Sequence, residues 1–157
     1  MINTDPLNLN LRLPIIGAPM FLVSSPELVI AQCKAGIVGS FPSLNARPAS
    51  QLSTWIQTIK SELAIVSKKD EKNIAPFAVN LVALSSNKRL DQDLAVCVAE
   101  QVPIIITSMR APTDVVKAVH SYGGIHFHDV VSIRHAEKAV EAGVDGLILV
   151  CHGAGGH

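Results

Sequence analysis

Uninterrupted apolar runs and amphipathic stretches alternate along the whole chain. Aliphatic runs bounded by glycine, proline or polar residues are typical of strands buried on both faces. Apolar residues spaced three or four apart predict helices that cover such strands. The pattern therefore predicts six strands with five helices between them, the strands lying at 11–20, 37–41, 76–82, 103–108, 125–130 and 147–150.

The clearest predicted helix is the second one, which carries an apolar stripe that is expected to pack on the sheet. The stripe consists of Leu52, Ile56, Ile59, Leu63 and Val66. The charged run 68–72 that follows is predicted to be a solvated linker. Ser86 or Asn87 is expected to cap the third helix.

Capping residues mark two further helices. Ser25 precedes Pro26, which combines a capping hydroxyl with proline at the first helical position. Ser132 is expected to cap the fifth helix, which Gly143 ends. Its stripe of Ile133, Ala136 and Val140 is predicted to face inwards.

Strict alternation of strand and helix predicts parallel strands with right-handed crossovers. An open doubly wound sheet and part of a (β/α)8 barrel both fit this pattern. Polar or glycine residues mark the carboxyl end of every predicted strand, which favours the barrel because all its strand ends face one mouth. We therefore predict a TIM barrel, of which a single domain, 1–157, supplies about six strands and five helices. A complete barrel needs about 250 residues.

The composition excludes several classes of protein. Of the 157 residues 48% are hydrophobic and 4% aromatic, and the net charge is zero with no basic stripe, so no nucleic-acid partner is expected. No apolar run approaches the roughly 20 residues of a membrane span, so no membrane partner is expected. The first residues lack a basic region followed by an apolar core, so they are not expected to be a signal peptide. Three widely spaced cysteines fit reduced thiols in a cytoplasmic protein.

The candidate chemistry is concentrated at the end of the chain. The apolar run 146–150 leads into a loop with Gly153, Gly155 and Gly156, which lack the Cβ atoms that keep a flat ligand or a phosphate away from the backbone. His157 beside that loop suits proton transfer, because the free pKa of histidine lies near neutral. An ordinary glycine-rich turn followed by a surface histidine is the alternative.

Polar residues at the other strand ends allow two interpretations each. Asn80 inside an apolar strand needs partners, either a ligand or neighbouring backbone. Thr107 either contacts a ligand or, with Ser108, caps the next helix. His126 and His128 point the same way on a strand and could ligate a metal with Asp129 nearby, but no second ligand cluster is present, and no metal site is expected.

The segment 13–20, Leu-Pro-Ile-Ile-Gly-Ala-Pro-Met, resembles the opening motif of the nitronate monooxygenases, formerly 2-nitropropane dioxygenases. Further motifs follow in the order and spacing of that family at 128–130, 133–136, 143–146 and 153–157. The resemblance covers almost the whole chain. Related flavin barrels share parts of it, including an FMN-dependent enoyl-acyl-carrier-protein reductase and a quinone reductase.

The resemblance implies an FMN-dependent (β/α)8 barrel with a smaller added domain that oxidises alkyl nitronates with O2 to carbonyl compounds and nitrite. The expected partners are a small nitro compound and O2. An FMN-dependent enoyl or quinone reductase and a non-catalytic truncated barrel are the alternatives. His152 departs from the family, where a small residue is expected.

Site residues follow from the resemblance residue by residue. Ala18, Pro19 and Met20 would lie against the isoalloxazine, and Asn80 and Thr107 would reach the ring or the ribityl chain. His128 or Asp129 would sit at the flavin edge, where some relatives place a lysine. Gly155 would let the cofactor approach, and His157 matches the catalytic base. These residues are all present in the sequence.

The parts that follow residue 157 in the family supply the remaining strands and the glycine loops for the FMN phosphate. An isolated chain of 157 residues would therefore leave strand edges unpaired. We expect it to associate, as a homo-oligomer or an aggregate, and to bind FMN poorly.

Overall fold

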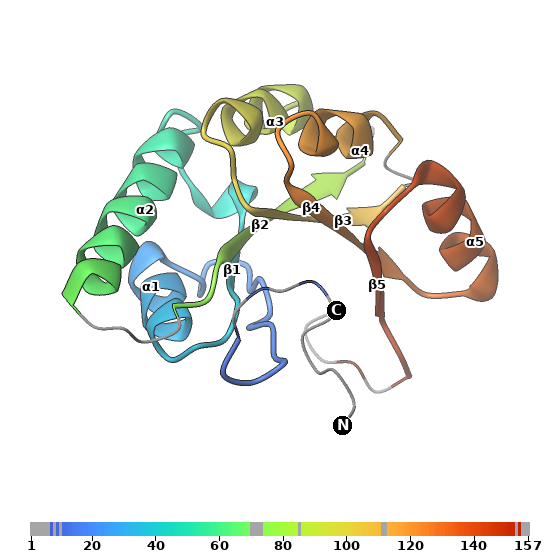
Figure 1. Ribbon diagram of the computed structural model, residues 1–157. Helices are drawn as coiled ribbons and strands as arrows, with labels where there is room; N and C mark the ends of the chain where they lie inside the picture. The colour runs from blue at the N-terminus through green and yellow to red at the C-terminus, as the bar shows by residue number, and fades with distance from the viewer. Residues whose placement is uncertain are drawn as a thin grey trace. The chain divides into compact units, whose positions relative to one another are not determined.

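The computed structural model describes residues 7, 9, 11–69, 74–84, 86–110, 113–152 and 154. The chain divides into two compact units, Met1–Ala78 and Val79–His157. The strands follow one another in one sheet in the order β1-β2-β3-β4-β5, without the reversal that an open doubly wound sheet would show (Figure 1). The predicted alternation of parallel strands and helices is confirmed, with five strands in place of six among the described residues.

The first unit contains α1 (Pro26–Lys34), β1 (Gly39–Pro42), a 3-10 turn (Ser43–Asn45) and α2 (Gln51–Lys69). The strand predicted at 11–20 is reduced to a single parallel bridge between Ile16 and Val38. Pro14 and Pro19 have no N–H to donate on either side of that bridge, so a longer ladder cannot form.

Both helices of the first unit begin and pack largely as predicted. The hydroxyl of Ser25 accepts a hydrogen bond from the backbone N–H of Leu28 at 3.4 Å and caps α1. Leu52, Ile56 and Ile59 of α2 are fully buried, and α1 packs against α2 and β1. The prediction that a linker begins at residue 68 is wrong, because α2 continues through Lys69. Residues 70–72 lie outside the described residues. Lysine is a good helix former, which agrees with this extension of α2.

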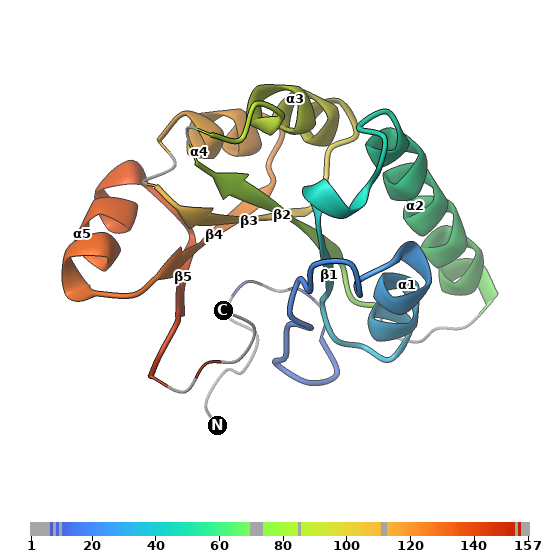
Figure 2. The ribbon, with the colours of Figure 1, turned by 180° about the vertical axis from the view of Figure 1, so that it is seen from behind.

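In the second unit β2 (Phe77–Ala83, which begins in the first unit) is followed by α3 (Leu90–Ala99), β3 (Ile104–Met109), α4 (Thr113–His120), β4 (Ile125–Val130), α5 (Ile133–Ala142) and β5 (Gly146–Leu149). The parallel pairing of β3 with β4 runs from Ile104 opposite Ile125 to Thr107 opposite His128. That of β4 with β5 runs from Phe127 opposite Gly146 to Val130 opposite Leu149. Figure 1 shows α3, α4 and α5 on one side of β3, β4 and β5, and Figure 2 shows the same arrangement from behind.

The caps of the second unit follow the sequence in part. Ser132 accepts from the backbone N–H of His135 at 3.3 Å, and Gly143 ends α5 in the left-handed conformation with φ 88°, both as predicted. The prediction that Ser86 or Asn87 caps α3 is wrong, since α3 begins at Leu90 without a side-chain cap. Asn87 instead orders the turn before the helix, donating to the carbonyl of Val82 at 2.9 Å.

The predicted inner stripe of α5 is also wrong. The side chains of Ile133 and Val140 are 80% and 62% exposed, and Ala139 is the residue of this helix that is buried. The contacts of α5 are with α4 and β4. Small side chains therefore occupy the covered face of α5, since Ala139 is buried and Ala136 of the predicted stripe is half-buried, while the larger apolar side chains are uncovered.

Candidate functional site

The strand register sorts the polar residues of β3 and β4 onto two faces. Thr107 lies opposite His128 in the parallel pairing, so Ser108 and Asp129 are the next residues along the two strands. Successive side chains of a strand point to opposite faces. Thr107, His126 and His128 therefore share one face, and Ser108 and Asp129 share the other.

The first face carries a buried hydrogen-bonded group. The hydroxyl oxygen of Thr107 lies 2.7 Å from Nε2 of His126 and 2.7 Å from Nδ1 of His128. All three side chains are at most 2% exposed. On β4 this face is the more buried one, since His126, His128 and Val130 are at most 3% exposed, whereas Ile125 and Asp129 on the other face are half-buried. Figure 1 shows helices on one side of these strands, and we infer that the more buried face is the one towards them.

The hydrogen-bond inventory assigns the tautomers of both imidazoles. One hydroxyl supplies one proton, so one imidazole must donate to Thr107 while the other accepts from it. Nδ1 of His126 is buried and has no hydrogen-bond partner among the described residues. An orphaned N–H is rarer in protein interiors than an orphaned acceptor. This places the His126 proton on Nε2, donating to Thr107, which donates in turn to Nδ1 of His128.

Burial keeps the two histidines neutral. It lowers the pKa of His126 to about 4, with the neighbouring His128 acting in the same direction and Asp145 opposing. Burial also lowers the pKa of His128, against the nearby Asp129. The carboxylate of Asp145 accepts from the backbone N–H of His126 at 2.7 Å and lies 2.9 Å from Nε2 of His120. The group on this face therefore fixes β3 and β4 and has the properties of a structural network.

The second face carries a chain of polar contacts across three strands. The side-chain amide of Asn80 in β2 donates to Oγ of Ser108 at 3.0 Å and to the carbonyl of Ile106 at 3.3 Å. Ser108 donates to the carboxylate of Asp129 at 2.6 Å. Ser108 and Asp129 are both partly exposed. The amide oxygen of Asn80 forms no hydrogen bond with any described residue, so it can accept one from a ligand.

The predicted cofactor residues of the second unit are thus divided. Asn80 belongs to the face turned away from the helices, and Asp129, the predicted alternative to His128, lies on the same face. The side chains of Thr107 and His128 lie on the helix-covered face and bond to each other. Ser108 was considered in the sequence only as a partner of Thr107. The register of β3 on β4 identifies Ser108 as a neighbour of Asp129, but the hydrophobic pattern of the sequence does not determine that register.

In the first unit, Ala18, Pro19 and Met20 lie in the loop after the Ile16 bridge. Ala18 and Met20 are exposed, Met20 to 41%, and Pro19 is half-buried. Ser40 donates from its hydroxyl to the carbonyl of Gly17. The hydrogen bond from Ser40 thus fixes the backbone at Gly17, where the loop begins. The side chains of the predicted flavin contacts Ala18 and Met20 remain accessible.

Asn45 holds the rest of this loop. Its amide nitrogen donates to the carbonyls of Met20 and Ser24, both at 3.0 Å, and its amide oxygen accepts from the N–H of Leu22 at 3.0 Å. Leu22 adopts a positive φ of 62°, which a leucine rarely does. The loop therefore presents a fixed apolar edge, in which Phe21, Leu22 and Val23 are 55%, 70% and 60% exposed.

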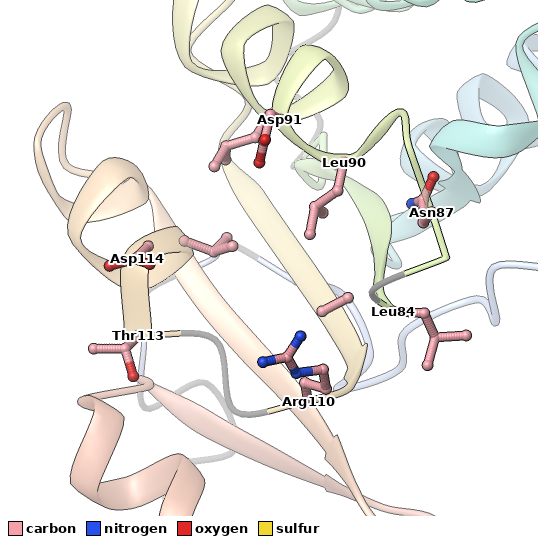
Figure 3. Close-up of a pocket in the computed structure, with 10 residues that line it drawn as sticks. Leu84, Asn87, Leu90, Asp91, Arg110, Thr113 and Asp114 are labelled. Carbon is pink, nitrogen blue, oxygen red and sulfur yellow. The ribbon is translucent and has the colours of Figure 1, made fainter.

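A cleft of about 490 Å³ opens between the first turns of α3 and α4. Figure 3 shows the guanidinium of Arg110 in this cleft, with Leu84 and Leu90 on one side and Asp114 on the other. Met109, with φ 88°, changes the direction of the chain just before Arg110. None of the predicted site residues lines the cleft.

Two of the predicted site residues, Gly155 and His157, lie outside the described residues. His152 is exposed. No group of three or more histidine, cysteine, aspartate or glutamate side chains suited to a metal ion occurs in the part of the chain that the structure describes. Within that part, no helix combines the length and the hydrophobicity needed to cross a bilayer.

Comparisons with known proteins agree with this arrangement. The chain resembles FabK from Thermotoga maritima with a TM-score of 0.74 and 26% identity, covering 90% of this chain and 41% of that one. A nitroalkane oxidase from Streptomyces ansochromogenes shares the fold with a TM-score of 0.70 at 21% identity, covering 88% of this chain and 46% of that one.

The enoyl reductase domain of MlnA from Bacillus amyloliquefaciens also shares the fold, with a TM-score of 0.68 at 17% identity, covering 82% of this chain and 30% of that one. The chain therefore spans less than half the length of these relatives. The comparison with curated proteins gives no match. The family model of the nitronate monooxygenases matches residues 7–157, so the chain belongs to the nitronate monooxygenase family, a family of flavin-dependent oxidoreductases.

Proposed function

We propose that this chain is part of an FMN-dependent enzyme that oxidises alkyl nitronates or nitroalkanes with O2 to carbonyl compounds and nitrite. The observation that carries the proposal is the polar chain from Asn80 through Ser108 to Asp129, on the helix-free face of the strands that the family match covers. The carboxyl ends of the strands are the usual place for ligands in parallel barrels.

The described residues fit the ring of a flavin. An isoalloxazine presents an N–H and carbonyl groups at one edge and two flat apolar faces. In the second unit, the amide oxygen of Asn80, which accepts no hydrogen bond from a described residue, suits the N–H. In the first unit, considered by itself, the exposed loop Ala18–Met20 has backbone and apolar side chains of the kind that contact a flat face. FMN, when bound, supplies the acceptor for two electrons and the reactivity with O2.

His157 is the proposed base. It closes the family motif at 153–157. A nitro group makes the adjacent carbon acidic, so a neutral imidazole can remove its proton, whereas a nitronate arrives already deprotonated. The base is thus needed for one form of the substrate, and both forms need positioning by the same site.

The experiment compares the two forms in flavin-loaded protein that carries residues 1–157. His157→Asn should lower kcat/KM for a neutral nitroalkane by about 10²–10⁴-fold, the usual contribution of a general base, and lower that for the preformed nitronate far less. His152→Asn, which removes an exposed histidine five residues earlier, is the matched control. Equal losses on both substrates would show that His157 does not act as the base.

A second candidate is an FMN-dependent enoyl or quinone reductase. The resemblance to FabK and to the enoyl reductase domain of MlnA favours it. Such an enzyme would be reduced by a nicotinamide, so rapid bleaching of the flavin absorbance by NADH or NADPH, without any nitro compound, would identify it. A non-catalytic protein would carry no flavin, and the purified protein would lack yellow colour.

A further inference from the structure

The cleft between α3 and α4 contains charges of both signs that do not neutralise each other (Figure 3). Arg110 follows the last residue of β3, and Asp91 and Asp114 belong to the first turns of α3 and α4. All three side chains line the cleft and are exposed. None of them forms an ion pair or a hydrogen bond with another described residue. The guanidinium and the two carboxylates are therefore available to a ligand.

The same cleft has an aliphatic part. Leu84, Leu90 and Leu94 line it and are half-buried, and Val115 beside them is 6% exposed. Covering the exposed part of such side chains is favourable, because it removes apolar surface from water. The volume of about 490 Å³ lies in the range of small-molecule sites. The cleft thus combines room for a small molecule with charged and aliphatic contacts.

The unpaired charges restrict the class of ligand. A simple anion would be attracted by Arg110 but repelled by Asp91 and Asp114, and a simple cation would be repelled by Arg110. An uncharged ligand would leave all three charges without a partner. A zwitterion satisfies both signs, because its carboxylate can form a bidentate pair with a guanidinium while its ammonium group approaches a carboxylate.

We propose that this cleft binds a small aliphatic amino acid. Its carboxylate pairs with Arg110, its ammonium group lies at Asp114, and its side chain covers the leucines of the cleft. Asp91 adds negative charge at the first turn of α3, which further favours the ammonium group. None of the residues assigned to flavin or to the nitro compound lines the cleft, so this site is additional to the proposed function.

The backbone before Arg110 supports the assignment. Met109 has a φ of 88°, which residues other than glycine rarely adopt. Its side chain is 60% exposed, so burial of that side chain does not compensate for the conformation. Strained residues of this kind occur at ligand sites, where the strain holds a contact group in place before the ligand arrives. Met109 therefore fixes the direction in which the chain leaves β3 and the position of Arg110 at the cleft.

The test compares three ligands that share one carbon skeleton and differ in charge. Leucine carries both charges, leucinamide carries only the positive one, and 4-methylpentanoate carries only the negative one. Each is titrated calorimetrically into protein that carries residues 1–157. The dissociation constant of leucine should be about tenfold lower than those of the other two, because each of them lacks one charge-assisted contact. The titration needs neither flavin nor turnover, so its outcome is independent of the proposed function.

Two variants assign the contacts. Arg110→Gln should weaken the binding of leucine about tenfold and leave that of leucinamide unweakened. Asp114→Asn should weaken leucine by a similar factor and leave 4-methylpentanoate unweakened. Arg134→Gln, which removes an exposed arginine of α5 that does not line the cleft, is the matched control and should bind all three ligands as the unmodified protein does.

Thermal unfolding identifies the variants that fold, and Arg110→Lys provides a second variant at that position. It keeps the charge but loses the bidentate fork, so its affinity for leucine should lie between those of Arg110→Gln and the unmodified protein. Absence of leucine binding at millimolar concentration, equal affinities for the three ligands, or an equal loss in Arg134→Gln would overturn the proposal.

Discussion

Acid should destabilise this protein through His126, a buried imidazole that the fold keeps neutral. Burial lowers its pKa from 6.5 to about 4. Between these pH values the unfolded chain binds a proton that the folded chain does not, so the free energy of unfolding falls as the pH falls through this window. The effect is complete below pH 4 and absent above pH 6.5.

The expected loss is about 3 kcal/mol, since each pKa unit corresponds to about 1.4 kcal/mol. His128 shifts in the same direction and adds to the loss, because burial lowers its pKa as well. Urea unfolding followed by circular dichroism at several pH values between 7.5 and 4 measures the free energy of unfolding. Carboxylates elsewhere also contribute to the slope, so the measurement needs a variant in which only this imidazole is missing.

His126→Gln removes the titrating group and retains an amide that can contact the hydroxyl of Thr107. Its unfolding free energy should fall about 3 kcal/mol less between pH 7.5 and 4 than that of the unmodified chain. His135→Asn removes an exposed histidine of α5 and is the control, with the pH dependence of the unmodified chain. Parallel curves for His126→Gln and the unmodified chain would refute the assignment of a buried neutral imidazole.

Two further predictions concern the loop of the first unit and the isolated chain. Asn45→Ala removes three hydrogen bonds to the loop at 20–24 and should lower the free energy of unfolding in urea by about 2 kcal/mol. Asn45→Asp keeps the acceptor for Leu22 but places an oxygen against the carbonyls of Met20 and Ser24, so it should also be less stable than the unmodified chain. Equal stability of all three proteins would contradict the assigned role of Asn45 in holding the loop. The isolated chain of 157 residues should associate in gel filtration and bind FMN weakly in a fluorescence titration. Among the described residues β5 is an edge strand of the sheet, and Ile133 and Val140 lie exposed on α5. A monomer that binds FMN at submicromolar affinity would contradict this expectation.

The sequence predicts the elements of this fold well where a local pattern determines them. The stripe of Leu52, Ile56 and Ile59 locates α2, and the run 125–130 coincides with β4, since burial on one or both faces selects these residues. The first predicted strand forms only a single bridge, because Pro14 and Pro19 have no N–H to donate to a longer ladder. The stripe of α5 fails because burial of Ile133 depends on which neighbours a helix meets, and periodicity alone does not supply that information.

The candidate site shows the same division. Asn80 could be selected from the sequence as a lone polar residue in an apolar strand, because a buried amide must have partners. The sequence did not decide between His128 and Asp129, which are adjacent and equally polar. The register of β4 on β3 places their side chains on opposite faces, and a shift by one residue would exchange the two faces.

Because the two faces of β4 carry different chemistry, stability and ligand binding should be separable in this protein. His126 and His128 bond to Thr107 under the helices, where replacing an imidazole changes the free energy of unfolding and its pH dependence. Asp129 lies on the opposite face and is bonded to Ser108, where replacing the carboxylate changes the charge that a ligand meets. A variant of His126 should therefore shift the acid unfolding curve without changing the dissociation constant for FMN. A variant of Asp129 should do the reverse, and a variant that altered both properties equally would mean that β4 is not oriented as the register requires.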